Sequence, residues 1–283
     1  MRPRTRPPWR NDLSDAESHL LKKSIPSIMF RGLSIKSVVR KLSLSTGLYR
    51  PGLYARLTSK AKREQFRREA AFYAQMLQPD DLCFDVGANV GERSETLLNA
   101  GMRVVAFEPQ KVCVTQILAR CRRFGDRLKI YQGGLGAEIG EATLYTNVNT
   151  VVSSLRKDWD TFQGSTRIPV TTLDHAIATY GRPAYCKIDV EGWELEVLKG
   201  LTQPLPLVSV EYHFKRHVLE NTFACLERLA QFGNLRINIT PAEELAFTSP
   251  EWLPLKDFLK VFPSSFENRV EYHYGDLFIR TEL

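Results

Sequence analysis

Leu82–Gly91 reads LCFDVGANVG and is followed by ERSETLL over residues 92–98. A short apolar run that breaks into two glycines, with apolar positions at helical spacing after it, predicts a buried strand, a tight turn and a helix. Glycine permits a positive φ and the close approach of a ligand, because it has no Cβ. Such a turn between a parallel strand and a helix N-terminus is typical of a nucleotide-binding pocket.

A second predicted strand ends in a carboxylate that belongs to the same pocket. Residues 103–107, RVVAF, lead into Glu108, which stands 23 positions after Asp85. In a doubly wound fold the end of the second strand lies beside the glycine turn, where a carboxylate accepts hydrogen bonds from a ribose diol. Nicotinamide dinucleotides and S-adenosylmethionine both carry a ribose, so the turn itself has to distinguish them.

The residues of the turn favour S-adenosylmethionine. The dinucleotide fingerprint G-x-G-x-x-G requires glycine where this chain has Asn89 and Glu92. A carboxylate in the first helical turn is also an unfavourable neighbour for a pyrophosphate, whereas S-adenosylmethionine carries no phosphate. We therefore predict an S-adenosylmethionine site. Its predicted residues from the turn and the second strand are Asp85, Gly87, Asn89, Gly91 and Glu108.

The charge of the chain is unevenly distributed. Its 283 residues are 43% hydrophobic and 25% charged, which suits one large α/β domain with an extension. Residues 1–68 carry 17 Lys and Arg against 4 acids, whereas residues 69–283 carry 22 against 28. The formal net charge of +7 therefore belongs to the leading segment. We expect the mildly acidic body not to bind nucleic acid.

Residues 1–60 are predicted to form a basic, partly disordered extension to the domain that carries the S-adenosylmethionine site, over residues 61–283. Residues 31–44 place apolar side chains at helical spacing among lysines and arginines, which predicts a short amphipathic helix. Two interpretations stay open. The helix attaches to an anionic membrane or nucleic acid, or it packs on the domain as a cap over the site, which we favour.

Cysteine usage and hydropathy favour a cytoplasmic protein without a spanning helix. The cysteines at positions 83, 113, 121, 186 and 225 form no C-x-x-C pair and are interpreted as reduced core thiols. No run of 18 apolar residues exists, and the start of the chain lacks the apolar region of a secretory signal. The oligomeric state has no signature in the sequence.

The remainder of the chain alternates predicted strands and helices, which indicates an open, mostly parallel sheet. A third strand over residues 128–131 precedes a glycine-rich loop at 132–136. In that loop Gly134 and Leu135 are candidates for contact with the cofactor's adenine, and a plain turn is the alternative. An insertion follows, with short strands at 141–145 and 167–170, where a substrate pocket can be elaborated.

Four polar side chains follow two later strands of the predicted sheet. The strand at 184–188 ends in Asp189 and Glu191, and the strand at 207–210 ends in Glu211 and His213. Because side chains alternate along a strand, two carboxylates two positions apart point to the same side. The carboxyl edge of the sheet is therefore predicted to carry an acidic site beside the cofactor.

Taken together, these motifs resemble those of the FkbM-type methyltransferases. The segments that carry the resemblance are DVGANVG at 85–91, FEP at 107–109, SSL at 153–155, TLD at 172–174, KIDVEGWE at 187–194 and GD at 275–276. It covers residues 66–283. It implies a class I, Rossmann-like fold with a seven-stranded, mostly parallel sheet, helices on both faces and an antiparallel last strand. It also implies S-adenosylmethionine-dependent methylation, usually at oxygen, of acceptors that include sugars and natural-product intermediates.

Methyl transfer from a sulfonium requires the enzyme mainly to hold the acceptor oxygen in line. Positioning contributes roughly 7 to 11 kcal/mol, and a general base adds about 10²- to 10⁴-fold. We predict that Asp189, Glu191 or His213 orients and deprotonates a hydroxyl of a small molecule or glycan, with Glu211 in support. We predict no metal ion. The alternative is a divalent cation held by the three carboxylates, since hard oxygen ligands suit Mg²⁺.

Other functions stay open at this point. A binding module would use the basic extension for nucleic acid or an anionic membrane, with the α/β body as a scaffold. An NAD-dependent enzyme is disfavoured by the broken fingerprint. An RNA methyltransferase is disfavoured by the acidic body and because residues 189–192, DVEG, lack the Asn/Asp-Pro-Pro-aromatic signature of many amino-methylating enzymes.

Overall fold

The computed structural model describes residues 64–147, 153–158, 161–213, 216–241, 245–262 and 274–282. The predicted extension at 1–60, its amphipathic helix at 31–44 and the boundary to the domain lie outside the described residues. Within the part of the chain that is described, no helix combines the length and the apolar character needed to cross a membrane.

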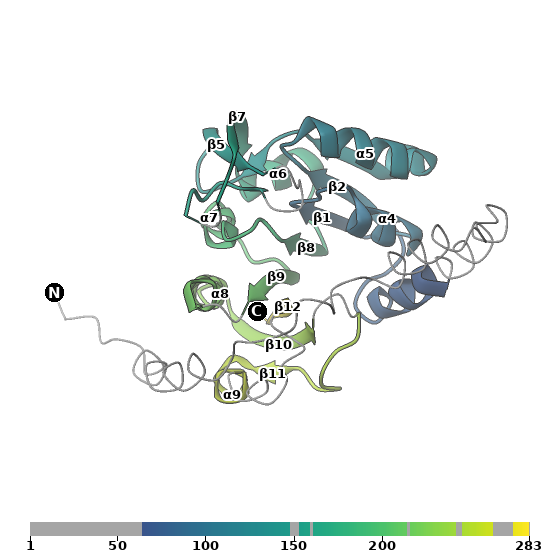
Figure 1. Ribbon diagram of the computed structural model, residues 1–283. Coiled ribbons are helices and arrows are strands. Elements are labelled where there is room, and N and C mark those ends of the chain that lie inside the picture. The colour runs from purple at the N-terminus through teal and green to yellow at the C-terminus, as the bar shows by residue number, and fades with distance from the viewer. Residues whose placement is uncertain are drawn as a thin grey trace, which may run out of the picture. The chain divides into compact units, whose positions relative to one another are not determined.

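The main sheet has the strand order β11-β10-β12-β9-β8-β1-β2-β3 (Figure 1). Its strands are β1 (Leu82–Val86), β2 (Arg103–Phe107), β3 (Leu128–Tyr131), β8 (Tyr185–Ile188), β9 (Leu207–His213), β10 (Asn234–Pro241), β11 (Leu253–Pro254) and β12 (Tyr274–Glu282). The five strands from β3 to β9 pair in parallel. The last strand, β12, runs antiparallel between β9 and β10.

This order confirms the predicted class I fold, with additions. The strand β10, over residues 234–241, was not predicted. The two-residue strand β11 pairs with β10 at the edge of the sheet and adds an eighth strand to the predicted seven. The chain order reverses between β1 and β8, because β1 leads to β2 and β3 on one side while the later strands lie on the other. Ligands of open α/β sheets bind at such a switch point, outside the carboxyl ends of the strands.

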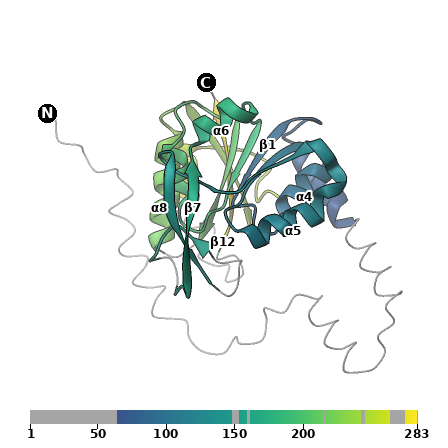
Figure 2. The ribbon, with the colours of Figure 1, turned by 90° about the horizontal axis from the view of Figure 1, so that it is seen from above.

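Helices cover both faces of the main sheet (Figure 2). They are a helix over residues 64–73, α4 (Glu92–Asn99), α5 (Lys111–Cys121), α6 (Leu173–Tyr180), α7 (Glu194–Lys199), α8 (Arg216–Leu229) and α9 (Leu255–Val261), with a short 3₁₀ segment η2 (Arg122–Arg127) after α5. Thr172 caps the N-terminus of α6, since its hydroxyl accepts the backbone N–H of His175 at 3.1 Å.

The core is divided between the two faces because neighbouring residues of a strand point to opposite sides. Cys83 of β1 joins a cluster with Phe72 and Tyr73 of the first helix and Leu97 of α4. The next residue, Phe84, instead contacts the rings of Phe107 and Tyr180, with centroids 5.2 and 6.5 Å away. All five cysteines are buried, and none of them forms a disulfide.

The predicted insertion is a separate sheet of four strands in the order β4-β7-β5-β6. Its strands are β4 (Gly134–Leu135), β5 (Gly140–Thr146), β6 (Ser153–Ser154) and β7 (Gly164–Thr171). Figure 1 shows β5 and β7 side by side, apart from the strands of the main sheet. Leu144, Ile168 and Val170 form its small core. Ser153 and Ser154 form the short strand β6, which pairs antiparallel with β5.

Candidate active site

The glycine turn between β1 and α4 takes left-handed backbone angles at three positions. The φ angles are 81° at Gly87, 48° at Asn89 and 79° at Gly91. A Cβ added to Gly87 would lie 1.9 Å from the backbone oxygen of Asp189, and one added to Gly91 would lie 3.0 Å from Cγ1 of Ile117. Both glycines are therefore required by close packing as well as by φ. The packing of Gly87 brings the turn directly against the loop that carries Asp189.

Glu108 stands beside this turn, as the strand order predicts. Its Oε2 accepts the backbone N–H of Asn89 at 2.8 Å, and its Oε1 accepts that of Gln110 at 2.8 Å. The residue is only 4% exposed. Burial raises the pKa of the Glu108 carboxyl to about 7, although the two backbone donors favour its ionised form. Each carboxylate oxygen keeps a further lone pair for another donor.

Asp85 lies inside β1 and is fully buried. Its Oδ2 accepts the Ser94 hydroxyl at 2.5 Å, while Oδ1 has no hydrogen-bond partner among the residues that the structure describes. An unsatisfied buried acceptor costs about 1 to 3 kcal/mol. Oδ1 is therefore suited to a donor that this part of the chain does not supply.

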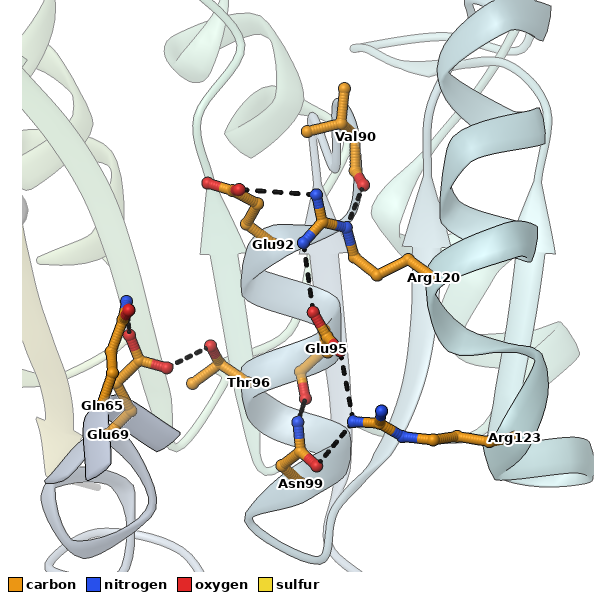
Figure 3. A network of polar contacts seen from close by, with 9 residues as sticks. All are labelled: Gln65, Glu69, Val90, Glu92, Glu95, Thr96, Asn99, Arg120 and Arg123. Carbon is orange, nitrogen blue, oxygen red and sulfur yellow. Dashed lines mark hydrogen bonds and ion pairs between the residues drawn. The ribbon is translucent and has the colours of Figure 1, made fainter. Parts of the chain in front are cut away.

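An ion network around the buried Glu95 anchors the turn to α5 (Figure 3). Arg120 donates from Nε to the backbone oxygen of Val90 at 2.9 Å, and from Nη1 to Glu95 at 3.1 Å. Glu95 is 2% exposed and also pairs with Arg123 at 3.2 Å. A buried carboxylate is tolerated when it is paired and hydrogen-bonded. The network, which the sequence analysis missed, joins α4, α5 and one carbonyl of the turn.

The predicted adenine contacts, Gly134 and Leu135, lie in β4 of the second sheet. A Cβ on Gly134 would meet Ile168 at 3.2 Å and Leu155 at 3.6 Å, and Leu135 is 1% exposed. The neighbours of Gly134 are thus residues of its own sheet. Contact of this pair with a cofactor stays a prediction.

The structure brings the predicted carboxylates together. One oxygen each of Asp189, Glu191 and Glu211 lies within 4.8 Å of the others. The reason that we gave for this meeting was wrong, because β8 ends at Ile188 and period-two alternation does not extend into the loop. Glu191 has a left-handed φ of 53°, so its side chain is directed by a bend of the loop. Glu211 comes from β9, the strand next to β8.

The charges of this cluster are unequal. Lys187 Nζ lies 2.6 Å from Asp189 Oδ2, and their side chains are 7% and 29% exposed. Burial alone would raise the pKa of Asp189, but the Lys187 ammonium and a hydrogen bond with Glu211 hold it below its usual value. Burial, together with the charges of Asp189 and Glu191, raises the pKa of Glu211 to about 11. At neutral pH Asp189 is therefore ionised and Glu211 is protonated.

A second ion pair supports the cluster from the last strand. Arg93 of α4 lies 3.7 Å from Asp276 of β12, and Asp276 stands opposite Glu211 in the sheet register. Asp276 is 7% exposed, and burial raises its pKa, although Lys187 and Arg93 oppose this rise. Arg93 and Asp276 thus join the helix after the glycine turn to the strand beside the acidic cluster.

The sequence analysis selected His213 and missed Lys187, Arg93 and Asp276. His213 ends β9, and its side chain lies outside what the structure describes, so its role stays a prediction. Lys187 had a detectable signal, because it interrupts an otherwise apolar strand and buried lysines are almost always paired.

The three carboxylates are also a donor set for a hard divalent cation. Without a cation, the Lys187 ammonium and the proton on Glu211 already compensate part of the negative charge of the three carboxylates. The prediction that the site works without a metal stays a prediction.

A family profile described as the methyltransferase FkbM domain matches residues 85–236, more than half of the chain. This chain belongs to the FkbM methyltransferase domain family. The match begins at Asp85 of β1 and includes the glycine turn, Glu108 and the acidic cluster. The resemblance inferred from the motifs is thereby confirmed.

The FkbM-family chain is similar to the hexuronic acid methyltransferase AglP of Haloferax volcanii. The two are 29% identical over 146 residues, which cover 48% of this chain and 57% of the relative. The chain therefore matches a little over half the length of that relative.

Two solved methyltransferase structures are similar at low identity. A precorrin-6Y C5,15-methyltransferase from Geobacter metallireducens is 11% identical with a TM-score of 0.41, and the match covers 76% of this chain and 87% of that one. An rRNA methylase from Streptococcus thermophilus is 12% identical with a TM-score of 0.41, over 76% of this chain and 95% of that one.

Proposed function

We propose that this FkbM-family chain transfers the methyl group of S-adenosylmethionine to a hydroxyl of a small molecule, and that the acceptor is a sugar or glycan. The observation that carries the proposal is the contact between the glycine turn and residues 189–193, the acidic loop between β8 and α7. There Gly87 packs against the backbone oxygen of Asp189. A cofactor bound by the turn and an acceptor bound by the acids would meet at this edge of the sheet. A sugar acceptor is supported by the relative that is named for hexuronic acid methylation.

The residues around the turn fit this cofactor. The Glu108 carboxylate is held by two backbone amides and keeps acceptor capacity for both hydroxyls of a ribose. The unsatisfied Oδ1 of Asp85 would accept a hydrogen bond from the cofactor's ammonium group, directly or through water. When bound, the cofactor supplies an electrophilic methyl group on a sulfonium.

The three carboxylates are assigned different roles toward the acceptor. Glu211 already holds a proton at neutral pH and is unsuited as a base. Asp189 is committed to Lys187 and to Glu211, and its low pKa makes it a weak base, so we assign it to orienting the acceptor hydroxyl. Glu191 is the remaining described member of the cluster and is assigned the hydroxyl proton. His213 is the alternative proton acceptor.

Calorimetric titration tests the cofactor assignment. We expect S-adenosylhomocysteine to bind the wild type at micromolar concentration and NADH not to bind. Glu108→Ala should weaken the affinity about 10- to 100-fold, because a charged acceptor is lost. Loss of less than about threefold would contradict the assignment of Glu108. If the folded protein binds neither ligand, the glycine turn has a structural role only.

An acceptor screen tests the second half of the proposal. Release of S-adenosylhomocysteine is measured with hexuronic acids, neutral hexoses and their glycosides, each beside the analogue whose hydroxyls are already methylated. We expect turnover with one class of free hydroxyl and none with the methylated analogues. Turnover on an amine or on RNA, with none on any hydroxyl, would contradict O-methylation.

A further inference from the structure

The backbone of Glu191 is unusual for its residue type. Its φ of 53° lies in the left-handed region, which glycine and asparagine adopt far more readily than glutamate. Such a conformation persists only when its surroundings enforce it, and it is enriched at functional sites. The contacts around Glu191 show what enforces it here.

The second sheet supplies the first contact. Ser154 of β6 donates its hydroxyl to the backbone oxygen of Glu191 at 2.7 Å. The same hydroxyl accepts the backbone N–H of Arg156 at 2.9 Å, so its orientation is defined. Ser154 is 1% exposed. The hydroxyl therefore connects a strand of the inserted sheet to the middle of the acidic loop.

A buried carboxylate supplies the second contact. Glu194 Oε1 accepts the N–H groups of Val190 at 3.1 Å and Gly192 at 3.0 Å, the amides on either side of Glu191. Glu194 Oε2 accepts the side-chain amide of Asn221 in α8 at 2.6 Å. Glu194 is 2% exposed. Its carboxylate thus closes the loop around Glu191 and ties the loop to α8.

We propose that Ser154, Glu194 and Asn221 are positioning residues that hold Glu191 in its left-handed conformation and so keep its carboxylate beside Asp189 and Glu211. Glu194 is assigned a positioning role, because it is 2% exposed and its carboxylate is bonded to three donors of the protein itself. The hydrogen bond from Ser154 connects the acidic loop to the second sheet. The inference rests on the proposed function for its kinetic test.

The primary test uses Glu194→Gln, which keeps the shape of the side chain and replaces one acceptor with a donor. We expect kcat to fall about 30- to 100-fold, because a small misplacement of a reacting group has effects of this size. KM for S-adenosylmethionine should stay within about threefold, because the hydrogen bonds of Glu194 go to Val190, Gly192 and Asn221, none of which is assigned to the cofactor. The matched control is Glu196→Gln in the same helix, whose carboxylate pairs with Lys199 at the surface.

Ser154→Ala keeps the proposal testable if Glu194→Gln does not fold. We expect a fall in kcat of about 3- to 10-fold, as for one lost hydrogen bond. Ser154→Thr, which restores a hydroxyl, should recover part of the rate. Ser165→Ala, at an exposed serine of β7, is the control.

A double-mutant cycle separates positioning from general stabilisation. If Ser154 acts through Glu191, Ser154→Ala should not lower the residual rate of Glu191→Gln further. Equal losses in the wild type and in Glu191→Gln would overturn the proposal.

Crystal structures of the wild type and of Ser154→Ala and Glu194→Gln provide a readout without activity. We expect the φ of Glu191 to leave the left-handed region in Glu194→Gln. An unchanged φ in both variants would overturn the positioning role whatever the kinetics show. Failure of the wild type to methylate any hydroxyl would instead contradict the proposed function, while a changed φ would still support the positioning role.

Discussion

The glycine turn and the acidic loop are neighbours that reach unusual backbone angles by different means. In the turn, positive φ falls on Gly87, Asn89 and Gly91, residue types that tolerate it. In the acidic loop it falls on Glu191, which depends on a serine from another sheet and on the Glu194 carboxylate. The residue types of the turn therefore permit its positive φ angles without support, whereas the conformation at Glu191 depends on segments far away in the chain.

The two regions also neutralise buried acids differently. Behind the turn, Glu95 is paired with two permanently charged guanidinium groups. In the acidic cluster, Asp189 is paired with Lys187 while Glu211 keeps its proton. Pairs of acids whose pKa values are driven apart are typical of sites that move protons. The first region thus has the charge pairing of a rigid support, and the second has the unequal pKa values that suit the proton transfer we propose there.

The largest effect should follow from removing the proton acceptor. We expect Glu191→Gln to lower kcat about 10²- to 10⁴-fold, the usual contribution of a general base. The affinity for S-adenosylhomocysteine should not change, because the substitution does not alter the turn. Steady-state kinetics and titration measure the two effects, with the exposed Glu138→Gln as control. A matching loss of affinity for S-adenosylhomocysteine would show that Glu191 also contributes to cofactor binding.

Gly87→Ala should break the contact between the regions. The new Cβ would overlap the backbone oxygen of Asp189, at a position with φ of 81°. Overpacking and left-handed strain together predict a loss of about 3 to 5 kcal/mol in the free energy of unfolding. Chemical denaturation measures it. Gly140→Ala is the control, since nothing lies within 4 Å of its added Cβ; equal losses in both variants would refute the close-packing argument.

Arg120→Ala should weaken the support of the turn. The substitution removes the donor to the Val90 carbonyl and one of the two arginines that pair with Glu95, so that only Arg123 remains. We therefore expect a loss of about 2 kcal/mol in the free energy of unfolding. Arg167→Ala removes an ion pair with Glu141 whose two side chains are 70% and 63% exposed. It should lose less than about 1 kcal/mol. Similar values for the two arginines would place the Arg120 network among ordinary surface pairs.

The affinity for S-adenosylhomocysteine should change about tenfold with pH through the protonation of Glu108. The Glu108 carboxyl has a pKa of about 7, raised by burial, and only its ionised form offers both oxygens to a ribose diol. Lowering the pH through this value protonates the carboxyl. The affinity for S-adenosylhomocysteine should therefore fall about tenfold between pH 8 and pH 6. Titrations across this range measure it, and Glu108→Gln should have a nearly flat profile. A wild-type profile that is equally flat would contradict the role of Glu108.

Much of the main sheet was predictable because its signals are local. Apolar runs of strand length, a glycine turn and the spacing to Glu108 each occupy a few neighbouring residues. The parallel pairing of β1 with β2 then places Glu108 beside Asn89. The strand at 234–241 was missed, although it is largely buried next to β12.

The sequence alone determined the family, the class I fold, the glycine turn and the identity of the three carboxylates. Only the tertiary structure decided how those carboxylates meet. The left-handed bend at Glu191 depends on Ser154 and Glu194, and the protonation of Glu211 depends on burial and on the charges of Asp189 and Glu191. Local patterns specify strands and turns because they act between near neighbours. Charge states and strained loops depend on groups that only folding brings together.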